Sequence, residues 1–365
     1  MATIRGTLLL LAGLLASSWA AAQTHDHDSA AEDTAPRFNL RGFADVDFAG
    51  HGGERPPDDT TGKTAFALGQ FDLYMVSKLS DKISFLGETV FELDEQQEIA
   101  VDLERLQITY RWSDALRLAA GRGHTALGYW NESYHHGKLL QPTVERPEAL
   151  KFEDDGGILP IHFVGLEASG RAASGAWDLA YVGYVANGRG PRPEVVQGAF
   201  DANGSKAVGG KLSLSRQGRH SFTFGGMAYH DIIPADPAQP GRESEIGATI
   251  VGAHLVYQDE HFQLLSEYFH VTDELRQTKE SFSHDAAYAL GVLHFGKWSP
   301  YAGIDWLDLD PKDPYYGPPL ASVTRALFGV RWDVASFNAL KLEYNRDDRP
   351  WGVEHVVVVQ SAFTF

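Results

Sequence analysis

Residues 129–160 carry carboxylates, amines and imidazoles, a combination that can attract or repel small ions. The stretch holds the carboxylates Glu145, Glu148, Glu153, Asp154 and Asp155, together with Glu132, the bases Lys138, Arg146 and Lys151, and the pair His135 and His136. A connection of this length inside a folded unit usually has a function of its own. We therefore expect an ion-attracting site here, against the alternative that these charges are simply solvated.

A second group of candidate ligands lies near the N-terminus, where "HDHD" occupies residues 25–28. Imidazole suits zinc and copper, so His25 and His27 could hold a divalent metal weakly. The surrounding residues 23–37 are polar and charged and show no periodicity, which is typical of a flexible leader. The leader interpretation is favoured over the metal site.

The elements that would position these groups are strands. In "ERLQITYRW" (104–112), Leu106, Ile108, Tyr110 and Trp112 share one face, and Arg105, Gln107, Thr109 and Arg111 share the other. The same alternation recurs along the chain, and it places these charged residues on the polar face: Lys78, Arg105, Arg111, Arg325, Arg331 and Glu343. In a large membrane barrel the charged face lines a water-filled lumen and the apolar face meets lipid.

The connections between these segments alternate between short and long. Short joints fall at 80–82, 113–115, 172–175, 216–219, 259–261, 296–299 and 334–338, and longer polar joints rich in proline and glycine lie between them. The count gives about sixteen strands, an even number. The sequence therefore predicts an all-β fold, a transmembrane antiparallel β-barrel with short periplasmic turns and long extracellular loops.

The first residues predict export. "MATIRGTLLLLAGLLASSWAAA" has an early arginine, an apolar run and a small-residue end, as a secretory signal peptide over residues 1–22 does. Residues 23–37 then form the leader and residues 38–365 the barrel. The net charge of -18 argues against a nucleic-acid partner, which prefers a basic surface. The chain has no cysteine, which excludes a disulfide framework.

The chain ends on "VEHVVVVQSAFTF", in which Val357, Val359, Phe363 and Phe365 fall on one face. We expect this strand to close the barrel against "FNLRGFADVDF" at residues 38–48. Closure leaves no unpaired strand edge in lipid, where an unsatisfied backbone group is costly. Phe363 and Phe365 are the predicted closure residues.

Taken together, the signal peptide, the alternating connections, the long third loop and the terminal phenylalanine resemble the bacterial outer-membrane porin superfamily. The resemblance implies a Gram-negative outer-membrane location, contact with the lipid bilayer and lipopolysaccharide, and insertion by the outer-membrane assembly machinery. It implies passive diffusion of small hydrophilic solutes or ions without a cofactor, with a homotrimer as one open alternative. It also implies that the third loop, residues 129–160, folds inward and narrows the pore.

Within that superfamily, "LRLAAGRGHTALGYWN" followed by "VERP" is loosely similar to the phosphate-selective porin O and P group. The inward face lacks that group's run of basic residues, because these acidic residues share it: Asp178, Glu267, Asp305, Glu343 and Glu354. Phosphate selectivity is therefore not expected. Two other functions are open: an outer-membrane barrel hydrolase, although no G-x-S-x-G motif occurs, and divalent metal uptake through the histidine-containing leader.

Overall fold

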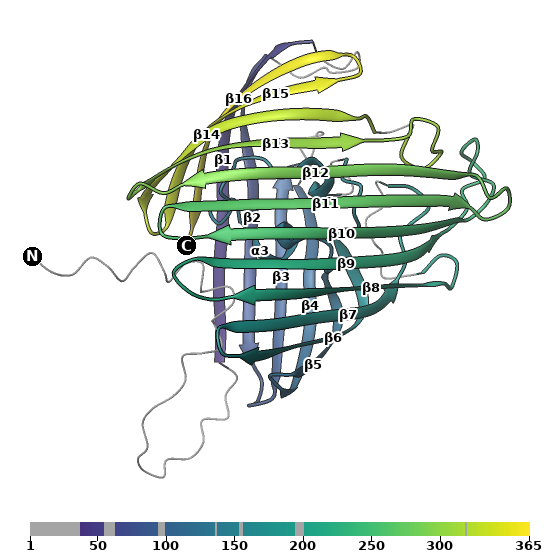
Figure 1. Ribbon diagram of the computed structural model, residues 1–365, viewed down its shortest axis with the longest axis horizontal. Coiled ribbons are helices and arrows are strands. Elements are labelled where there is room, and N and C mark those ends of the chain that lie inside the picture. The colour runs from purple at the N-terminus through teal and green to yellow at the C-terminus, as the bar shows by residue number, and fades with distance from the viewer. Residues whose placement is uncertain are drawn as a thin grey trace, which may run out of the picture. The chain divides into compact units, whose positions relative to one another are not determined.

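Sixteen antiparallel strands close into one barrel in the computed structural model (Figure 1). The structure describes residues 37–54, 63–93, 99–135, 137–152, 156–193, 201–317 and 320–365. The strands are β1 (Arg37–Gly53), β2 (Thr64–Lys78), β3 (Ile83–Leu93), β4 (Ile99–Ser113), β5 (Leu116–His124), β6 (His162–Ser174), β7 (Trp177–Asn187), β8 (Lys206–Arg216), β9 (Ser221–Ile233), β10 (Ile246–Gln258), β11 (Phe262–Leu275), β12 (Ser281–Leu293), β13 (Trp298–Asp308), β14 (Val323–Ala335), β15 (Asn338–Arg349) and β16 (Gly352–Thr364). The predicted fold class and strand number are confirmed.

Each strand pairs with its sequence neighbours, and β1 also pairs with β16 to close the barrel. Phe363 lies opposite Ala44 in this last pairing. The backbone of Phe365 continues it, because its N–H donates to the Gly42 carbonyl at 3.0 Å and its carbonyl accepts from the Gly42 N–H at 2.9 Å. The final residue therefore belongs to the hydrogen-bonded seam.

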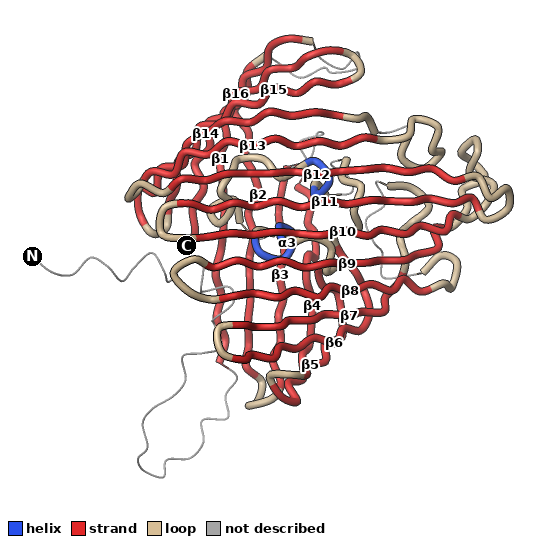
Figure 2. The backbone as a smooth tube through the Cα atoms, in the orientation of Figure 1, coloured by secondary structure: helices blue, strands red, loops and turns tan. Residues whose placement is uncertain are grey.

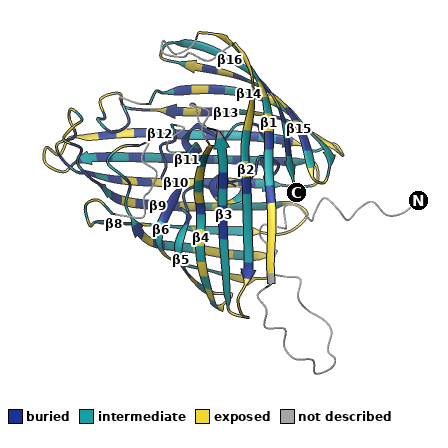
Figure 3. Ribbon diagram, turned by 180° about the vertical axis from the view of Figure 1, so that it is seen from behind, coloured by how far each residue is buried: buried dark blue, intermediate teal, exposed yellow. Residues whose placement is uncertain are grey.

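The outer face of the barrel is apolar, as the period-two pattern predicts. On β4, Ile108 is 50% exposed and Trp112 is 69% exposed, whereas the alternate residues Thr109 and Arg111 are only partly exposed. Figure 3 shows the resulting bands of buried and exposed residues along the strands. Near the turn end of the barrel, Trp298 and Trp332 stack with their ring centroids 5.2 Å apart. Aromatic residues at this level match the interfacial belts of membrane proteins.

Seven short turns lie at one end of the barrel, at 79–82, 114–115, 175–176, 217–220, 259–261, 294–297 and 336–337. At the other end the connections are longer, with one exception: residues 350–351 alone join β15 to β16. The expected strict alternation fails there because β15 and β16 extend further than the polar sequence "DDRPWG" suggests. Figure 2 shows how little of the described chain is helical. No helix in these described parts is long and apolar enough to cross a membrane.

Candidate functional site

The longest connection, residues 125–161, packs against the inside of the barrel wall. It contains the predicted loop 129–160, and from here on the whole connection is called the third loop. It contains helix α3 (Tyr129–Ser133) and the 3-10 helix η1 (Glu148–Leu150). Among its apolar side chains that are at most 1% exposed are Leu127, Trp130, Leu150, Ile158, Leu159 and Ile161. They form a core with inward residues of the wall, among them Met227, Ile250, Phe269 and Leu290. The hydrophobic effect therefore holds the loop inside the barrel.

A wall carboxylate binds the start of α3. Gly128 precedes the helix with φ 93°, a conformation that L side chains rarely adopt. The carboxylate of Glu267 on β11 accepts the N–H of Tyr129 at 2.5 Å and the N–H of Trp130 at 2.8 Å. The first N–H groups of a helix have no carbonyl acceptor within the helix, so the wall carboxylate accepts these two hydrogen bonds. The contact fixes where the loop enters the barrel.

Lys341 and Glu343, two positions apart on β15, bind the middle of the loop. Glu343 accepts the N–H of Val144 at 2.8 Å, and its carboxylate also accepts from the hydroxyl of Tyr301 at 2.9 Å. Lys341 donates from Nζ to the carbonyls of Lys138 and Thr143, at 2.6 and 2.7 Å. Buried backbone polar groups must find partners, and here the side chains of Lys341 and Glu343 provide them.

An ion-pair network holds the segment around η1. Arg325 on β14 lies 2.6 Å from Glu148, and the same guanidinium binds Asp347 through two hydrogen bonds of 2.7 and 2.6 Å. Burial alone would raise the pKa of Glu148, but Arg325, Lys151 and Arg349 outweigh it and hold this pKa at about 2. Glu148 is therefore ionised throughout the physiological range.

The structure brings five of the predicted site residues together at the interface of loop and wall. They are Glu145, Glu148, Arg325, Arg331 and Glu343. Arg331 donates to the carbonyls of Leu139 and Gln141 at 2.6 and 2.9 Å. The basic residues of β14 and β15 thus bind the loop and do not face it across an open space.

The other predicted wall residues lie elsewhere. Lys78 pairs with Asp81 at 2.8 Å and Arg111 lies 3.8 Å from Asp114, both at the turn end of the barrel. Arg105 pairs with Glu88 at 2.8 Å on the wall formed by β3 and β4. The predicted residues Glu153, Asp154, Asp155, His25 and His27 lie outside the described part of the chain, as does His136.

A set of inward carboxylates on the first three strands is missing from the predicted site. We call it the acidic strip; it consists of Asp45 and Asp47 on β1, Asp72 on β2 and Glu88 on β3. Asp45, Asp72 and Glu88 are 2–4% exposed, whereas Phe71, next to Asp72, is 42% exposed on the outer face. Asp45 lies within electrostatic reach of two loop residues, Lys138 and Glu145. On this side of the barrel, the acidic strip therefore approaches the loop through Asp45.

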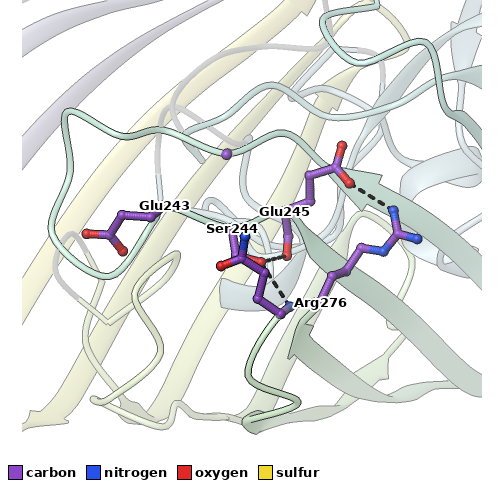
Figure 4. Close-up of a pocket in the computed structure, with 6 residues that line it drawn as sticks. Glu243, Ser244, Glu245 and Arg276 are labelled. Carbon is purple, nitrogen blue, oxygen red and sulfur yellow. Dashed lines mark hydrogen bonds and ion pairs between the residues drawn. The ribbon is translucent and has the colours of Figure 1, made fainter.

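A shallow hollow lies at the loop end of the barrel, lined by Ala235, Glu243, Ser244, Glu245, Arg276 and Gln277 (Figure 4). Arg276 donates to the carboxylate of Glu245 at 2.8 Å, and its backbone N–H donates to the Glu245 carbonyl at 2.9 Å. The polar groups that line the hollow therefore mostly bind each other. We therefore take the third loop, and not this hollow, as the candidate functional site.

The chain was compared with known families and structures. No protein-family model matches it, and the comparison with curated proteins gives no match. The outer-membrane expressed OmpT of Vibrio cholerae is similar in structure, with a TM-score of 0.59 at 10% identity over 93% of this chain and 100% of that one. Another Vibrio cholerae OmpT structure, described as a trimer form, has a TM-score of 0.58 at 11% identity over 91% of this chain and 100% of that one.

Two further structures share the architecture. OmpF of Salmonella typhi in complex with daunomycin has a TM-score of 0.57 at 13% identity, over 90% of this chain and 97% of that one. A mutant of the Rhodopseudomonas blastica porin has a TM-score of 0.52 at 13% identity, over 90% of this chain and 100% of that one. At this level of identity the likeness is one of fold. The chain therefore has the fold of bacterial outer-membrane β-barrels.

Proposed function

We propose that this protein is a passive diffusion channel for small hydrophilic solutes or ions in the outer membrane of a Gram-negative bacterium. The observation that carries the proposal is the third loop, which is held inside the barrel by Glu267, Lys341, Glu343 and Arg325. A loop fixed at this depth narrows a water-filled lumen and places charges beside the path of a solute.

The acidic strip supports a preference for cations on the same path. Its four carboxylates share the inner wall of β1–β3, and the neighbouring base Arg105 already pairs with one of them, Glu88. Inward carboxylates attract cations over roughly one Debye length, about 8 Å at physiological salt. We include cation preference in the proposed function.

The test is single-channel recording in planar bilayers. A variant in which residues 130–158 are replaced by a short glycine-serine linker should conduct more than the wild type, because the constriction is gone. Heat-modifiable migration in detergent gels checks that the shortened barrel has folded. Wild-type conductance and selectivity in a folded, shortened barrel would refute the constriction, because the loop would then not limit the path.

The proposal includes export by residues 1–22, insertion by the outer-membrane assembly machinery, and contact with the lipid bilayer and lipopolysaccharide. It also includes a homotrimer, since one similar structure is described as a trimer form. Fractionation with outer membranes and the mass of the detergent-solubilised assembly test these two points. Recovery of the folded chain in the soluble periplasmic fraction would refute the location.

An outer-membrane hydrolase is the alternative class, and one arrangement favours it. Thr272 Oγ1 lies 3.3 Å from His270 Nε2, and His270 Nδ1 lies 2.9 Å from Asp285 Oδ1, the order of a hydroxyl–imidazole–carboxylate triad. However, Tyr268 on the same face is 45% exposed, so the group lies on the outer wall. Ester hydrolysis that Thr272→Val abolishes would establish the enzyme; activity equal in both proteins would exclude this site.

A further inference from the structure

Three histidines and one glutamate meet where the third loop leaves β5 and returns to β6. Glu104 belongs to β4, His124 ends β5, His162 begins β6, and His135 follows α3. One ligand atom from each side chain can be chosen so that all four lie within 4.8 Å of one another. His124 and His162 are direct partners in the β5–β6 pairing, so the sheet itself sets two of the positions.

The backbone brings Glu104 into this group through a β-bulge. The pairing of β3 with β4 shifts between Glu88, opposite Arg105, and Val90, opposite Asp102. The extra residue is on β4, where Leu103 and Glu104 stand between the two pairs. Leu103 is 46% exposed, whereas Glu104 is only 7% exposed. Bulges commonly re-aim a side chain next to a functional site.

The hydrogen bonds of Asn131 determine the tautomer of His135. The amide nitrogen of Asn131 donates to the Thr125 carbonyl at 3.1 Å, so its Oδ1 remains the acceptor for His135 Nδ1, 2.9 Å away. His135 therefore carries a proton on Nδ1 and directs Nε2 towards Glu104, at 3.3 Å from the carboxylate. A histidine that ligates a metal typically donates its other N–H to such a fixed acceptor.

Two of the imidazoles converge on the carboxylate of Glu104. Glu104 Oε2 is approached by Nε2 of both His135 and His162. Because Nδ1 of His135 is the donor to Asn131, Nε2 presents its lone pair to Glu104, and a metal ion between these two groups would be ligated by both. His162 Nδ1 is also buried, without a hydrogen-bond partner among the described residues.

The aromatic ring of Phe152 packs against two members of the group. The rings of His124 and His135 lie 3.6 Å apart between centroids, and Phe152 stacks parallel to His162 at 6.1 Å. Phe152 also meets His135 edge-on, with 5.3 Å between the ring centroids. The guanidinium carbon of Arg146 lies 4.3 Å from the centroid of the Phe152 ring. An apolar ring beside metal ligands limits the access of water to them.

We propose that Glu104, His124, His135 and His162 bind one divalent transition-metal ion, for which zinc is the best match, and that this ion fastens the third loop to the barrel wall. Three imidazoles and a carboxylate suit zinc, and four protein ligands without an open position are typical of a structural site. Tetrahedral zinc with these ligands needs donor atoms about 3.3 Å apart, so donor separations of up to 4.8 Å have to shorten by up to about 1.5 Å on binding.

A second group, Asp273, His284 and Asp313, has similar spacing but a different hydrogen-bond pattern. His284 Nδ1 accepts the backbone N–H of Asp310 at 3.2 Å, so its proton lies on Nε2 and is donated to Asp313 at 2.6 Å. Both ring nitrogens are therefore engaged. The contrast singles out the group around His135 as the one with a nitrogen lone pair directed at its neighbours.

The test measures zinc itself and does not depend on channel activity. The full-length protein, folded in detergent and carrying His25→Asn and His27→Asn to remove the leader ligands, is stripped with a chelator and dialysed against Zn²⁺. We expect one zinc per chain by elemental analysis, and with Co²⁺ the visible absorption bands of a tetrahedral site. Zinc should also slow amide hydrogen exchange in the segment around His135.

The variants separate metal binding from folding. Glu104→Gln with His135→Gln should abolish stoichiometric binding, whereas His254→Gln, a buried histidine outside the group, should leave it unchanged. Asn131→Ala keeps all four ligands and should weaken zinc binding about tenfold to a hundredfold. Absence of stoichiometric zinc in the parent protein, or binding that persists in the folded double variant, would overturn the proposal. If the double variant fails to fold, unchanged zinc affinity in folded Asn131→Ala would overturn it instead.

Discussion

The ring of Phe365 lies directly over Gly42 of β1. A Cβ added to Gly42 would come within 2.3 Å of Phe365 Cζ, closer than real side chains approach. The backbones of the two residues exchange two hydrogen bonds, and the ring stacks on Phe71 of β2 at 5.5 Å. The last residue therefore spans the seam, covering β1 and touching β2.

The first prediction concerns this seam. Gly42→Val should displace the Phe365 ring and lower barrel stability by on the order of 1 kcal/mol, because overpacking forces the ring from its place. Removing Phe365 should reduce the yield of folded barrel in outer membranes. Gly50→Ala on the same strand is the control, since its Cβ would have no neighbour closer than 3.7 Å. Equal folded yields for all three variants would argue against closure through Phe365.

The second prediction is a pH dependence that arises from Glu148. Its pKa is about 2 in the folded protein against an ordinary value of 4.5, so its ionised form stabilises the fold. This contribution is fully present above about pH 4.5 and is lost as the pH falls towards 2. Glu148→Gln should therefore cost about 1–3 kcal/mol near neutral pH and progressively less in acid, as measured by denaturant unfolding in detergent.

The control for Glu148 is an exposed pair. Lys279 lies 2.9 Å from Glu274 with both side chains largely in solvent, so Glu274→Gln should change stability by less than about 1 kcal/mol. A stability difference between wild type and Glu148→Gln that stays constant from pH 6 to pH 2 would contradict the assigned ion pairs.

The barrel itself could be predicted from sequence because period-two alternation and turn chemistry are local signals. The apolar residues of "ERLQITYRW" face outward as expected, and the seven short turns fall within a few residues of the predicted positions. Both features depend on neighbours along the chain, which the sequence displays directly.

The site could be predicted only in part, because it depends on contacts between distant residues. The sequence identifies the third loop and the wall residue Arg325. It does not show that Arg331 and Lys341 donate hydrogen bonds to carbonyls of the loop, which lie about 200 residues away in the sequence. The β-bulge at Glu104 gives no local signal either. In the sequence, His124, His135 and His162 are far apart and form no motif. The β5–β6 pairing and the loop bring them together in the structure.

The third prediction concerns charge selectivity. Neutralising the acidic strip with Asp72→Asn and Glu88→Gln should lower cation preference, with a larger effect at low salt because screening is weaker there. Arg105→Gln should raise cation preference, since it removes the positive charge beside Glu88. Lys78→Gln is the control, because Lys78 lies at the turn end beside Asp81. Reversal potentials in salt gradients measure each effect, and identical potentials for all variants would exclude the strip from the ion path.

The fourth prediction concerns the anchor of the third loop. Lys341 is 1% exposed and donates to the carbonyls of Lys138 and Thr143, so Lys341→Met leaves two buried acceptors without their donor. Each unsatisfied acceptor costs about 1–3 kcal/mol, which the loop can avoid by detaching locally from β15.

Detachment of the loop has two measurable consequences. Amide hydrogen exchange in residues 137–145 should become faster in Lys341→Met while exchange in the strands stays unchanged, because the barrel seam is not involved. Single-channel current should become noisier, since a loop that moves within the lumen changes the width of the path. Lys297→Met is the matched control: its Nζ also donates to a carbonyl, that of Val334 at 2.9 Å, but at an exposed turn where water replaces it. Unchanged exchange in the loop of Lys341→Met would show that Arg331 and Glu343 hold it without this lysine.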